Sequence, residues 1–527
     1  MGRRAGRCKA ADAVFVLLGM LAKVTGATPW GIDARPVDVE VDVRLGLPQL
    51  HLVGLGDTAV RESRERVRSA IRNSEIDLQH RAVLIHLAPA DLRKEGSHLD
   101  LPIALGLLAA HQIFPAQCLT GRLFCGELGL DGTLRPVRGA LAMATLARDL
   151  GIPELLLPRE NAPEAAALDG VTVLAVGCLR DAVAHVRGAQ VLPPATPRAT
   201  ARQPATLDLA DVRGHATAKR ALEIAAAGGH NLLLIGPPGS GKTMLARRLA
   251  SLLPPLLREE AIVVTKIQSI AGESLPDGLV MDRPFRNPHT DTSTAGLIGG
   301  TAAARPGEVT LAHCGVLFLD ELPEFRRDTL EALRQPVEDG RVTVVRAGAR
   351  FTYPARFLLL AAMNPCSCGF LGDPRHECRC SEPEVARYRT RISGPLLDRI
   401  DLHVEMPALT LAELHHSGGE SSADVARRVV AAREVQRLRF GQSKTTPLNA
   451  ALTEGQLQRH CRLEPAAQAL LDTAFLKLGL SIRTVTRVLK VARTIADLGQ
   501  AERIAAAHVA EAIQYRSLDR PVASTDS

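Results

Sequence analysis

The chain has 527 residues, of which 46 % are hydrophobic and only 3 % aromatic. This length predicts roughly two to four domains, and the scarcity of aromatic residues predicts cores built from aliphatic side chains on many helices. The net charge of +7 permits an anionic partner such as nucleic acid but does not demand one. Ten cysteines, four of them between Cys366 and Cys380, argue against a disulfide framework and favour a reducing compartment.

The N-terminus has the outline of a short signal peptide, because basic residues precede the apolar run Ala13–Ala22. The run continues directly into a β-like segment, which disfavours export. No stretch of about 18 or more apolar residues occurs, so we predict no membrane span.

The front of the chain, residues 1–190, has the pattern of an α+β domain. Apolar and polar residues alternate in Val37–Val43 and again in Leu50–Leu55, as in half-buried strands. Asp57–Ile71 keeps its charges on one side, which predicts a surface helix. A strand at Ala82–Leu87 and an apolar helix at Asp100–Ala110 complete the pattern.

A proline-rich linker over residues 191–207 precedes a phosphate-loop motif. The apolar run Asn231–Ile235 predicts a buried strand, and Met244–Leu253 has helical periodicity. Glycines between a strand and a helix let backbone N–H groups surround a phosphate at the positive end of the helix. The predicted nucleotide-binding residues are Gly236, Pro237, Pro238, Gly239, Ser240, Gly241, Lys242 and Thr243. Lys242 would reach the β- and γ-phosphates of ATP, and Thr243 would bind Mg²⁺.

Two later strands end in polar residues that suit the same site. Gly315–Leu319 leads into Asp320, placed to hold Mg²⁺, and into Glu321, placed to polarise an attacking water. Phe357–Met363 leads into Asn364, at the edge where the γ-phosphate would lie. In a parallel sheet these strand ends meet beside the phosphate loop.

With the segment Gly394–Asp401, the order of these features resembles AAA+ ATPases. The resemblance implies that Arg399 is an arginine finger that reaches into a neighbouring subunit, with Arg391 as the fallback candidate. A planar, permanently charged guanidinium suits a transferred phosphoryl group. The resemblance therefore implies a homo-oligomeric ring, most simply a hexamer, with residues 208–406 as its ATPase core.

Several segments resemble one group more closely, the ComM/YifB family of magnesium-chelatase-like ATPases. The segments that carry this resemblance are Glu62–Arg68, Arg305–Glu308, Leu311–His313, Phe318–Phe325 and Met363–Cys366. One departure is Thr290, where that family usually has a second histidine, so no histidine pair is assigned a role.

Within the front domain, Gly126–Val137 and Leu157–Asn161 resemble the Lon-type protease domain. His98 stands where that family has its serine, and Leu141 where it has its lysine. Ser97 is one position away, but a serine hydroxyl without a base is a weak nucleophile. The resemblance therefore implies a degenerate domain, with an ATP-dependent peptidase as a disfavoured alternative.

Cys366, Cys368, Cys378 and Cys380 form two C-x-C pairs separated by nine residues. Four thiolates in one loop could bind a structural Zn²⁺ with no open coordination position. The alternative is reduced loop cysteines, because the spacing is tighter than the usual C-x-x-C.

Residues 407–516 are helical and arginine-rich and are predicted to form a C-terminal lid, followed by a disordered tail over residues 517–527. In AAA+ proteins a helix in this place carries the sensor-2 arginine, and Arg483 matches that position. Arg487 lies four residues further on the same face, so the sequence alone does not separate the two.

The predicted fold class is α/β: an AAA+ P-loop NTPase with a parallel sheet and a helical lid, behind an α+β Lon-protease-like domain of the ribosomal S5 domain 2-like type. The family resemblance implies a cytoplasmic motor that uses ATP and Mg²⁺ to remodel DNA, as a helicase or in branch migration during recombination and natural transformation. Arg341–Tyr353 predicts a hairpin whose Arg346 and Arg350 contact single-stranded or branched DNA. The alternatives are a magnesium-chelatase motor subunit acting on a protein partner, and a nucleotide-gated scaffold.

Overall fold

The computed structural model describes residues 20–79, 81–197, 207–273, 278–300, 305–346, 349–410, 413, 419–441, 448–516 and 518. The chain folds as two compact units. One comprises residues 1–201 together with 261–280, and the other comprises residues 202–260 and 281–527. Residues 1–19, most of the predicted linker and nearly all of the predicted tail lie outside the described residues.

The N-terminal unit is built on a seven-stranded mixed sheet in the order β3-β4-β2-β1-β5-β8-β9. Its strands are β1 (Met20–Trp30), β2 (Asp33–Arg44), β3 (Leu50–Val53), β4 (Ala82–Ala88), β5 (Arg122–Phe124), β8 (Glu154–Pro158) and β9 (Thr172–Val176). β1, β2 and β4 pair antiparallel, and the other neighbours pair parallel. β6 (Glu127–Leu128) and β7 (Leu134–Arg135) form a separate small pair. The predicted strands at residues 37–43, 50–55 and 82–87 are confirmed as β2, β3 and β4.

The helices of this unit are α1 (Thr58–Asn73), α2 (Asp100–Ala110), the 3-10 turn η1 (Ala116–Leu119), α3 (Ala140–Asp149), α4 (Ala162–Ala166) and α5 (Leu179–Val186). α1 begins after Asp57, whose side chain accepts a hydrogen bond from the backbone of Val60 at 2.8 Å. Every residue of α2 is buried, as its uniformly apolar sequence predicts. Both helices were predicted within two residues, α1 from its periodicity and α2 from its apolar run.

One helix of the N-terminal unit comes from a distant part of the sequence. α8 (Arg258–Ala271) follows the phosphate-loop helix along the chain, yet residues 261–280 group with the N-terminal unit. Lys266 Nζ lies 3.1 Å from Asp33 Oδ1, and the Ser269 hydroxyl accepts a hydrogen bond from the backbone N–H of Gly139 at 2.9 Å. Burial raises the pKa of Glu164 to about 7, although hydrogen bonds from Ser269 and Leu141 oppose the shift. The segment is therefore anchored by charged and polar contacts.

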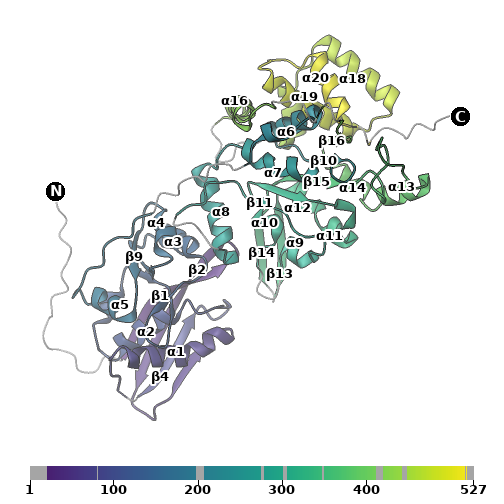
Figure 1. Cartoon of the computed structure of the whole chain (residues 1–527). Helices are drawn as coiled ribbons and strands as arrows, with labels where there is room; N and C mark the ends of the chain where they lie inside the picture. The colour runs from purple at the N-terminus through teal and green to yellow at the C-terminus, as the bar shows by residue number, and fades with distance from the viewer. Residues whose placement is uncertain are drawn as a thin grey trace. The chain divides into compact units, whose positions relative to one another are not determined.

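The second unit contains a five-stranded sheet in the order β11-β12-β15-β10-β16, with every neighbouring pair parallel (Figure 1). Its strands are β10 (Leu232–Ile235), β11 (Phe285–Arg286), β12 (Val316–Leu319), β15 (Leu358–Met363) and β16 (Leu402–Glu405). All residues of β10, β12 and β15 are buried, as continuous apolar strands covered on both faces should be. A hairpin of β13 (Arg341–Arg346) and β14 (Ala349–Pro354) extends away from this sheet (Figure 1).

Many short helices surround this sheet. They are η2 (Leu209–Asp211), α6 (Ala216–Gly228), α7 (Lys242–Leu252), α9 (Thr294–Ile298), α10 (Glu308–Leu311), η3 (Leu322–Glu324), α11 (Arg327–Ala332), α12 (Arg334–Asp339), α13 (Glu382–Arg389) and α14 (Gly394–Leu397). The C-terminal helices are α16 (Ser422–Phe440), η4 (Asn449–Ala451), α17 (Glu454–His460), α18 (Pro465–Leu478), α19 (Ile482–Leu498) and α20 (Ala506–Gln514). Their buried residues share one hydrophobic core with α6, α7 and the sheet. The predicted helical region is present, and its action as a lid stays a prediction.

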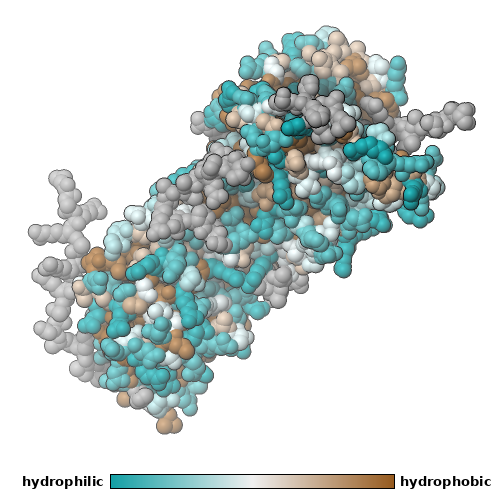
Figure 2. All heavy atoms as spheres, in the orientation of Figure 1, coloured by the Kyte–Doolittle hydropathy of each residue, from teal (hydrophilic) through white to brown (hydrophobic). Residues whose placement is uncertain are grey.

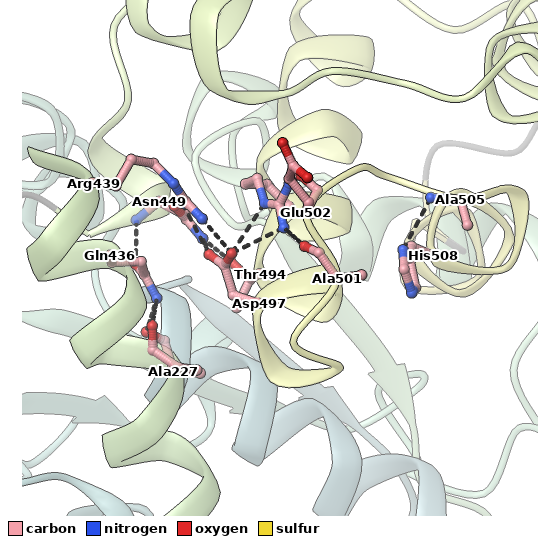
Figure 3. Close-up of polar contacts among 12 residues, drawn as sticks. Ala227, Gln436, Arg439, Asn449, Thr494, Asp497, Ala501, Glu502, Ala505 and His508 are labelled. Atoms are coloured by element: carbon pink, nitrogen blue, oxygen red, sulfur yellow. Dashed lines mark hydrogen bonds and ion pairs between the residues drawn. The ribbon is translucent and has the colours of Figure 1, made fainter.

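A buried polar network joins the C-terminal helices to α6 (Figure 3). The carboxylate of Asp497 accepts hydrogen bonds from Asn449 at 2.7 Å, from Arg439 at 3.0 Å and from Arg493 at 3.1 Å. Gln436 donates to the backbone carbonyl of Ala227 at the end of α6, at 3.1 Å. Because each buried charge has a partner, loss of either partner would leave the other uncompensated.

The visible face of the molecule mixes hydrophilic and hydrophobic residues without a continuous apolar band (Figure 2). Among the described residues, we find no helix with the length and hydropathy needed to cross a bilayer. The apolar run Ala13–Ala22 ends inside β1, which begins at Met20, so its last residues belong to a strand.

Candidate functional site

The phosphate-loop motif lies between a central buried strand and a helix. β10 ends at Ile235, the loop follows, and α7 begins at Lys242. Gly239 and Gly241 have φ angles of 77° and 86°, which side chains with a Cβ rarely adopt, and a Cβ at either would meet nothing within 4 Å. A Cβ on Gly236, in contrast, would lie 2.4 Å from the carbonyl oxygen of Met406. The loop thus needs glycine for conformation at two positions and for space at a third.

The side chains of Thr243 and Asp320 meet beside this loop. The Thr243 hydroxyl donates to Asp320 Oδ2 at 2.6 Å, and the other carboxylate oxygen accepts from the backbone N–H of Glu321 at 3.0 Å. Hydroxyl and carboxylate oxygens are the ligands that Mg²⁺ prefers. The donor set therefore fits the predicted metal.

Glu321 follows directly, with an exposed side chain and a φ angle of 52°. A left-handed conformation is costly for a residue with a side chain and is concentrated at functional sites. Among the described residues, the Glu321 carboxylate has no hydrogen-bond or ion-pair partner, so it is free to act on a solvent molecule.

Lys242 and Asn364 also converge, because β10 and β15 pair parallel with Ile235 opposite Met363. Lys242 Nζ donates to the carbonyls of Gly236 at 2.6 Å and Pro237 at 2.9 Å, and to Asn364 Oδ1 at 3.2 Å. Burial lowers the pKa of Lys242, and the nearby carboxylates of Asp320 and Glu321 oppose the shift. The ammonium is thus placed where a phosphate oxygen could replace its weak carbonyl partners.

Two further polar atoms lie at this site, and one of them, on His215, was missed by sequence reasoning. The Ser240 hydroxyl and Nε2 of His215 are buried without a hydrogen-bond partner among the described residues. His215 precedes α6 and has a φ angle of 51°, and burial lowers its pKa. Orphaned buried polar atoms fit a loop that holds a polar ligand. No motif signals His215, since it lies outside the phosphate-loop pattern.

Arg399 lies near the end of the parallel strands that is opposite to the phosphate loop. Its backbone carbonyl accepts from the Asn231 side chain at 2.9 Å, immediately before β10, whereas the phosphate loop follows β10. Five residues of extended chain separate Asn231 from Gly236, about 16 Å. The Arg399 guanidinium donates to the carbonyl of Pro395 at 2.6 Å and pairs with Glu338. Arg399 therefore does not face the phosphate loop of its own chain.

Arg487 is held at this same edge by Asp401. Burial opposes ionisation of that carboxylate, but hydrogen bonding to His230 and the Arg487 guanidinium keep the pKa of Asp401 well below its usual range. Arg483 lies one turn earlier on α19 and is exposed, and Ser481 caps the helix. The fallback finger, Arg391, pairs with Glu324 at 3.0 Å and is also exposed.

The four clustered cysteines come together in space. Their sulfur atoms all lie within 4.8 Å of one another, and Cys366 Sγ is 3.4 Å from Cys368 Sγ and 3.7 Å from Cys378 Sγ. A tetrahedral zinc site with Zn–S bonds of about 2.3 Å needs sulfur separations of about 3.8 Å. A hydrogen bond from the backbone of Phe370 lowers the pKa of Cys368 to about 6. The donor set and its spacing fit Zn²⁺.

This cysteine loop also touches the phosphate loop. A Cβ on Gly369 would lie 2.8 Å from Cδ of Pro238 and 3.9 Å from Cγ of Asn364. Gly369 is flanked by Cys368, and Asn364 lies two residues before Cys366. The cysteine cluster and the nucleotide site are therefore parts of one local structure.

The Lon-like residues form no serine–lysine pair. Ser97 donates a hydrogen bond to the carboxylate of Glu127, and Leu141 is fully buried. His98 is buried 3.2 Å from the Thr28 hydroxyl, and burial lowers its pKa to about 4. The amine of Lys94 donates to the backbone carbonyl of Leu87 at 2.9 Å rather than to Ser97.

The predicted hairpin is confirmed, with Arg346 opposite Ala349 and Val345 opposite Arg350. Arg350 is exposed, and Val345 beside it is 66 % exposed. The tip, residues 347–348, and the side chain of Arg346 lie outside the described residues.

Three family models match the chain. They describe magnesium chelatase, subunit ChlI, over residues 208–414, subunit ChlI of Mg-chelatase over residues 39–161, and the ChlI C-terminal region over residues 419–516.

Full-length relatives are also similar. The uncharacterized protein YifB of Salmonella typhimurium is 46 % identical over 502 residues, which cover 95 % of this chain and 98 % of the relative. The competence protein ComM of Haemophilus influenzae is 43 % identical over 509 residues, with the same coverage. The chloroplastic magnesium-chelatase subunit ChlI of Oryza sativa subsp. indica is 26 % identical over 228 residues, which cover 38 % of this chain and 49 % of the relative.

Two substitutions separate nucleotide binding from hydrolysis. Lys242→Ala should abolish ATP binding, because it removes the cation of the phosphate loop. Glu321→Gln should keep binding and slow hydrolysis by about 10²-fold or more, because it removes the water-polarising carboxylate. Fluorescence anisotropy of a labelled ATP analogue and phosphate release would measure the two steps. Asp328→Asn, which removes a nearby exposed carboxylate, is the control, and normal turnover by Glu321→Gln would contradict the assignment.

The cysteine cluster should bind about one zinc per chain. Metal analysis of freshly purified, reduced protein would measure it, and Cys366→Ser/Cys380→Ser should lose the metal. Cys178→Ser, which changes a cysteine outside the cluster, should retain it. Because Gly369 packs on Pro238, metal removal should also weaken ATP binding. Reduced protein that contains no zinc would reject the site.

Proposed function

The chain belongs to the ComM/YifB family of magnesium-chelatase-like AAA+ ATPases, and from this premise we propose that it is a ring-forming motor that hydrolyses ATP to remodel DNA. The proposed activity is branch migration or unwinding during homologous recombination and natural transformation. The Haemophilus influenzae relative is named a competence protein, which supports this direction. Dependence on ATP supports a cytoplasmic location.

The position of Arg399 carries the proposal of a ring. Its loop is bonded to the start of β10, while the phosphate loop follows the end of the same strand. A guanidinium at one edge of the sheet cannot stabilise charge on a phosphoryl group at the other edge. In a ring it can reach the nucleotide of the next subunit, and a hexamer is the proposed assembly. Arg399 must then leave Glu338, its partner in the single chain.

The roles of the remaining residues follow from their contacts. Lys242 would hold the phosphates of ATP, and Asn364 would position the γ-phosphate. Thr243 and Asp320 would hold Mg²⁺, which supplies positive charge against the phosphates when bound. Glu321 would accept a proton from the attacking water, whose oxygen bonds to the γ-phosphorus as the bond to the ADP oxygen breaks. Arg399 of a neighbouring subunit would stabilise the charge on the transferred group.

Arg483 is proposed to act across the same interface. α19 runs along the edge that holds Asp401 and His230, because Arg487 pairs with the first and Thr494 lies 2.7 Å from the second. Arg483 lies one turn before Arg487 on α19. Its exposure supports the choice of Arg483 over Arg487, whose guanidinium is already paired.

DNA is the proposed substrate of the ring, and the β13–β14 hairpin is its proposed grip. β14 is followed by β15, which ends at Met363 just before Asn364, so the hairpin is connected directly to the proposed γ-phosphate side of the site. The exposed Arg350 suits a phosphate contact that does not depend on base sequence.

A magnesium-chelatase-type motor that acts on a protein partner is the second candidate, supported by the ChlI family models. A peptidase is disfavoured, since Ser97 contacts a carboxylate and not a lysine. ATPase activity of the pure protein with and without single-stranded, duplex and branched DNA would decide between the two motors. An ATPase rate that increases with DNA supports the proposal. A rate that none of the three DNAs changes favours the chelatase-type motor.

Arg399→Ala should bind ATP normally and hydrolyse it on the order of 10³-fold more slowly, as expected for loss of an arginine finger. Mixing this variant with Lys242→Ala subunits should restore part of the activity, because some interfaces then combine an intact phosphate loop with an intact finger. Arg391→Ala is the control, since it removes another ion-paired arginine of this region. Mixed rings that assemble without any recovery would contradict action between subunits.

Arg346→Ala/Arg350→Ala should weaken DNA binding and DNA-stimulated ATPase while leaving basal ATPase nearly unchanged. Titration of labelled single-stranded and branched DNA at several salt concentrations would show the loss, together with a shallower salt dependence. Arg334→Ala/Arg341→Ala removes the same charge from α12 and the base of the hairpin. An equal effect of both double variants would reject a specific role for the tip.

A further inference from the structure

We propose that the exposed face of α1 in the N-terminal unit is a second contact surface for the phosphate backbone of nucleic acid. The surface, called here the arginine ridge, consists of Arg61, Arg68 and Arg72, with Arg64 beside it. This inference rests on the proposed function, because it assumes that DNA is the substrate.

The three ridge residues lie on one line along the helix. At about 100° per residue, Arg61, Arg68 and Arg72 fall within about 40° of one another around the helix axis. All three are exposed. The buried residues of α1 lie on the opposite side: Val60, Ser63, Val67, Ala70 and Ile71. The ridge therefore points away from the core of its unit.

Within the described structure, neither acidic residue of α1 forms an ion pair with Arg61, Arg68 or Arg72. Glu65 lies 3.1 Å from Arg64, and Glu62 lies 3.9 Å from Arg66. Arg66 in turn binds the buried carboxylate of Asp100 at 2.9 Å. In the part of the chain that the structure describes, the side chains of Arg61, Arg68 and Arg72 have no hydrogen bond and no ion pair. The arginines of α1 that form ion pairs, Arg64 and Arg66, are therefore not among the three ridge residues.

Folding gains little from the ridge, although Arg72 lies in the last turn of α1, where the helix dipole favours a cation. Arg64 and Arg68, and Arg68 and Arg72, are like charges four residues apart, each pair destabilising by about 0.2–0.5 kcal/mol. Arg61 lies in the first turn, where the helix dipole disfavours a cation. A binding role accounts for a row of arginines that stability does not explain.

The chemistry and spacing of the ridge fit a nucleic-acid backbone. From Arg61 to Arg72 the helix rises about 16 Å, and one strand of duplex DNA carries a phosphate about every 3.4 Å. Three arginines can therefore each reach a separate phosphate on one strand. All five basic residues of α1 are arginine, whose planar fork binds phosphate oxygens in a bidentate manner. A nucleic-acid backbone, with its regularly spaced phosphates, is therefore the ligand that fits the arginine ridge.

The test is DNA binding by full-length Arg61→Ala/Arg68→Ala/Arg72→Ala. Alanine favours the helix, so the variant should fold. We expect affinity for labelled single-stranded and duplex DNA to fall about tenfold at moderate salt. The slope of log K against log salt should decrease by about 2 on single strands, since each lost phosphate contact removes about 0.7. Basal ATPase should not change. Arg61→Lys/Arg68→Lys/Arg72→Lys should retain most of the salt slope.

The matched control is Arg44→Ala/Arg148→Ala/Arg180→Ala, which removes three exposed but ion-paired arginines from the same unit. Equal binding by the ridge and control variants would overturn the inference. If hairpin variants still lose DNA affinity in that case, the proposed function survives and only the ridge fails. A parent protein that binds no DNA overturns both. Polyglutamate binding that the ridge variant loses while DNA binding persists would assign the ridge to an acidic protein segment instead.

Discussion

The parallel pairing of β10 with β15 on one side and β16 on the other determines what a single subunit can do. It brings the phosphate loop, Asp320 and Asn364 to one edge of the sheet, because parallel strands end on the same side. The same pairing places the start of β16, and with it the Arg399 loop, at the opposite edge. One chain therefore contains every predicted part of the ATP site. Its Arg399, however, lies at the opposite end of the strands from its own phosphate loop. The proposal of a neighbouring subunit therefore rests on strand order and direction.

Asn231 and Asp401 hold that second edge together. The Asn231 side chain bonds the backbone of Arg399 at 2.9 Å and that of Leu359 at 2.9 Å, and its own N–H donates to Asp401 at 3.2 Å. Asp401 continues the contact to Arg487 on α19, and His230 links it to Thr494. The Arg399 loop, two strands and α19 thus share one buried polar cluster. Breaking one of these contacts would leave a buried charge without its partner, so the cluster stabilises this arrangement.

Much of this arrangement was predictable from the sequence, and the exceptions have physical causes. Continuous apolar runs before Gly236, Asp320 and Asn364 predict buried parallel strands, and the structure brings Lys242, Thr243, Asp320 and Asn364 into contact. β1 was not predicted, since its first residues belong to an apolar run that resembles a signal peptide. His215 was not predicted either, because its role depends on where α6 starts relative to the loop. The packing of residues 261–280 in the N-terminal unit depends on contacts such as Lys266 with Asp33, which no local pattern encodes. Local periodicity predicts elements, whereas long-range polar contacts decide which unit an element joins.

The cysteine loop shows how a site without catalytic groups can still affect catalysis. Four thiolates would leave no open coordination position, so a zinc ion held there could not activate water. Its effect would have to be mechanical. Gly369 fills the space against Pro238, and Asn364 lies between β15 and the first cysteine. A fixed loop conformation therefore fixes both a wall of the phosphate loop and the amide that Lys242 contacts. A loop of this composition, with glycines and prolines and no helix or strand before α13, has little secondary structure to hold it. Cross-linking by a metal would supply the rigidity that the backbone lacks, at the point where the γ-phosphate must be positioned most accurately.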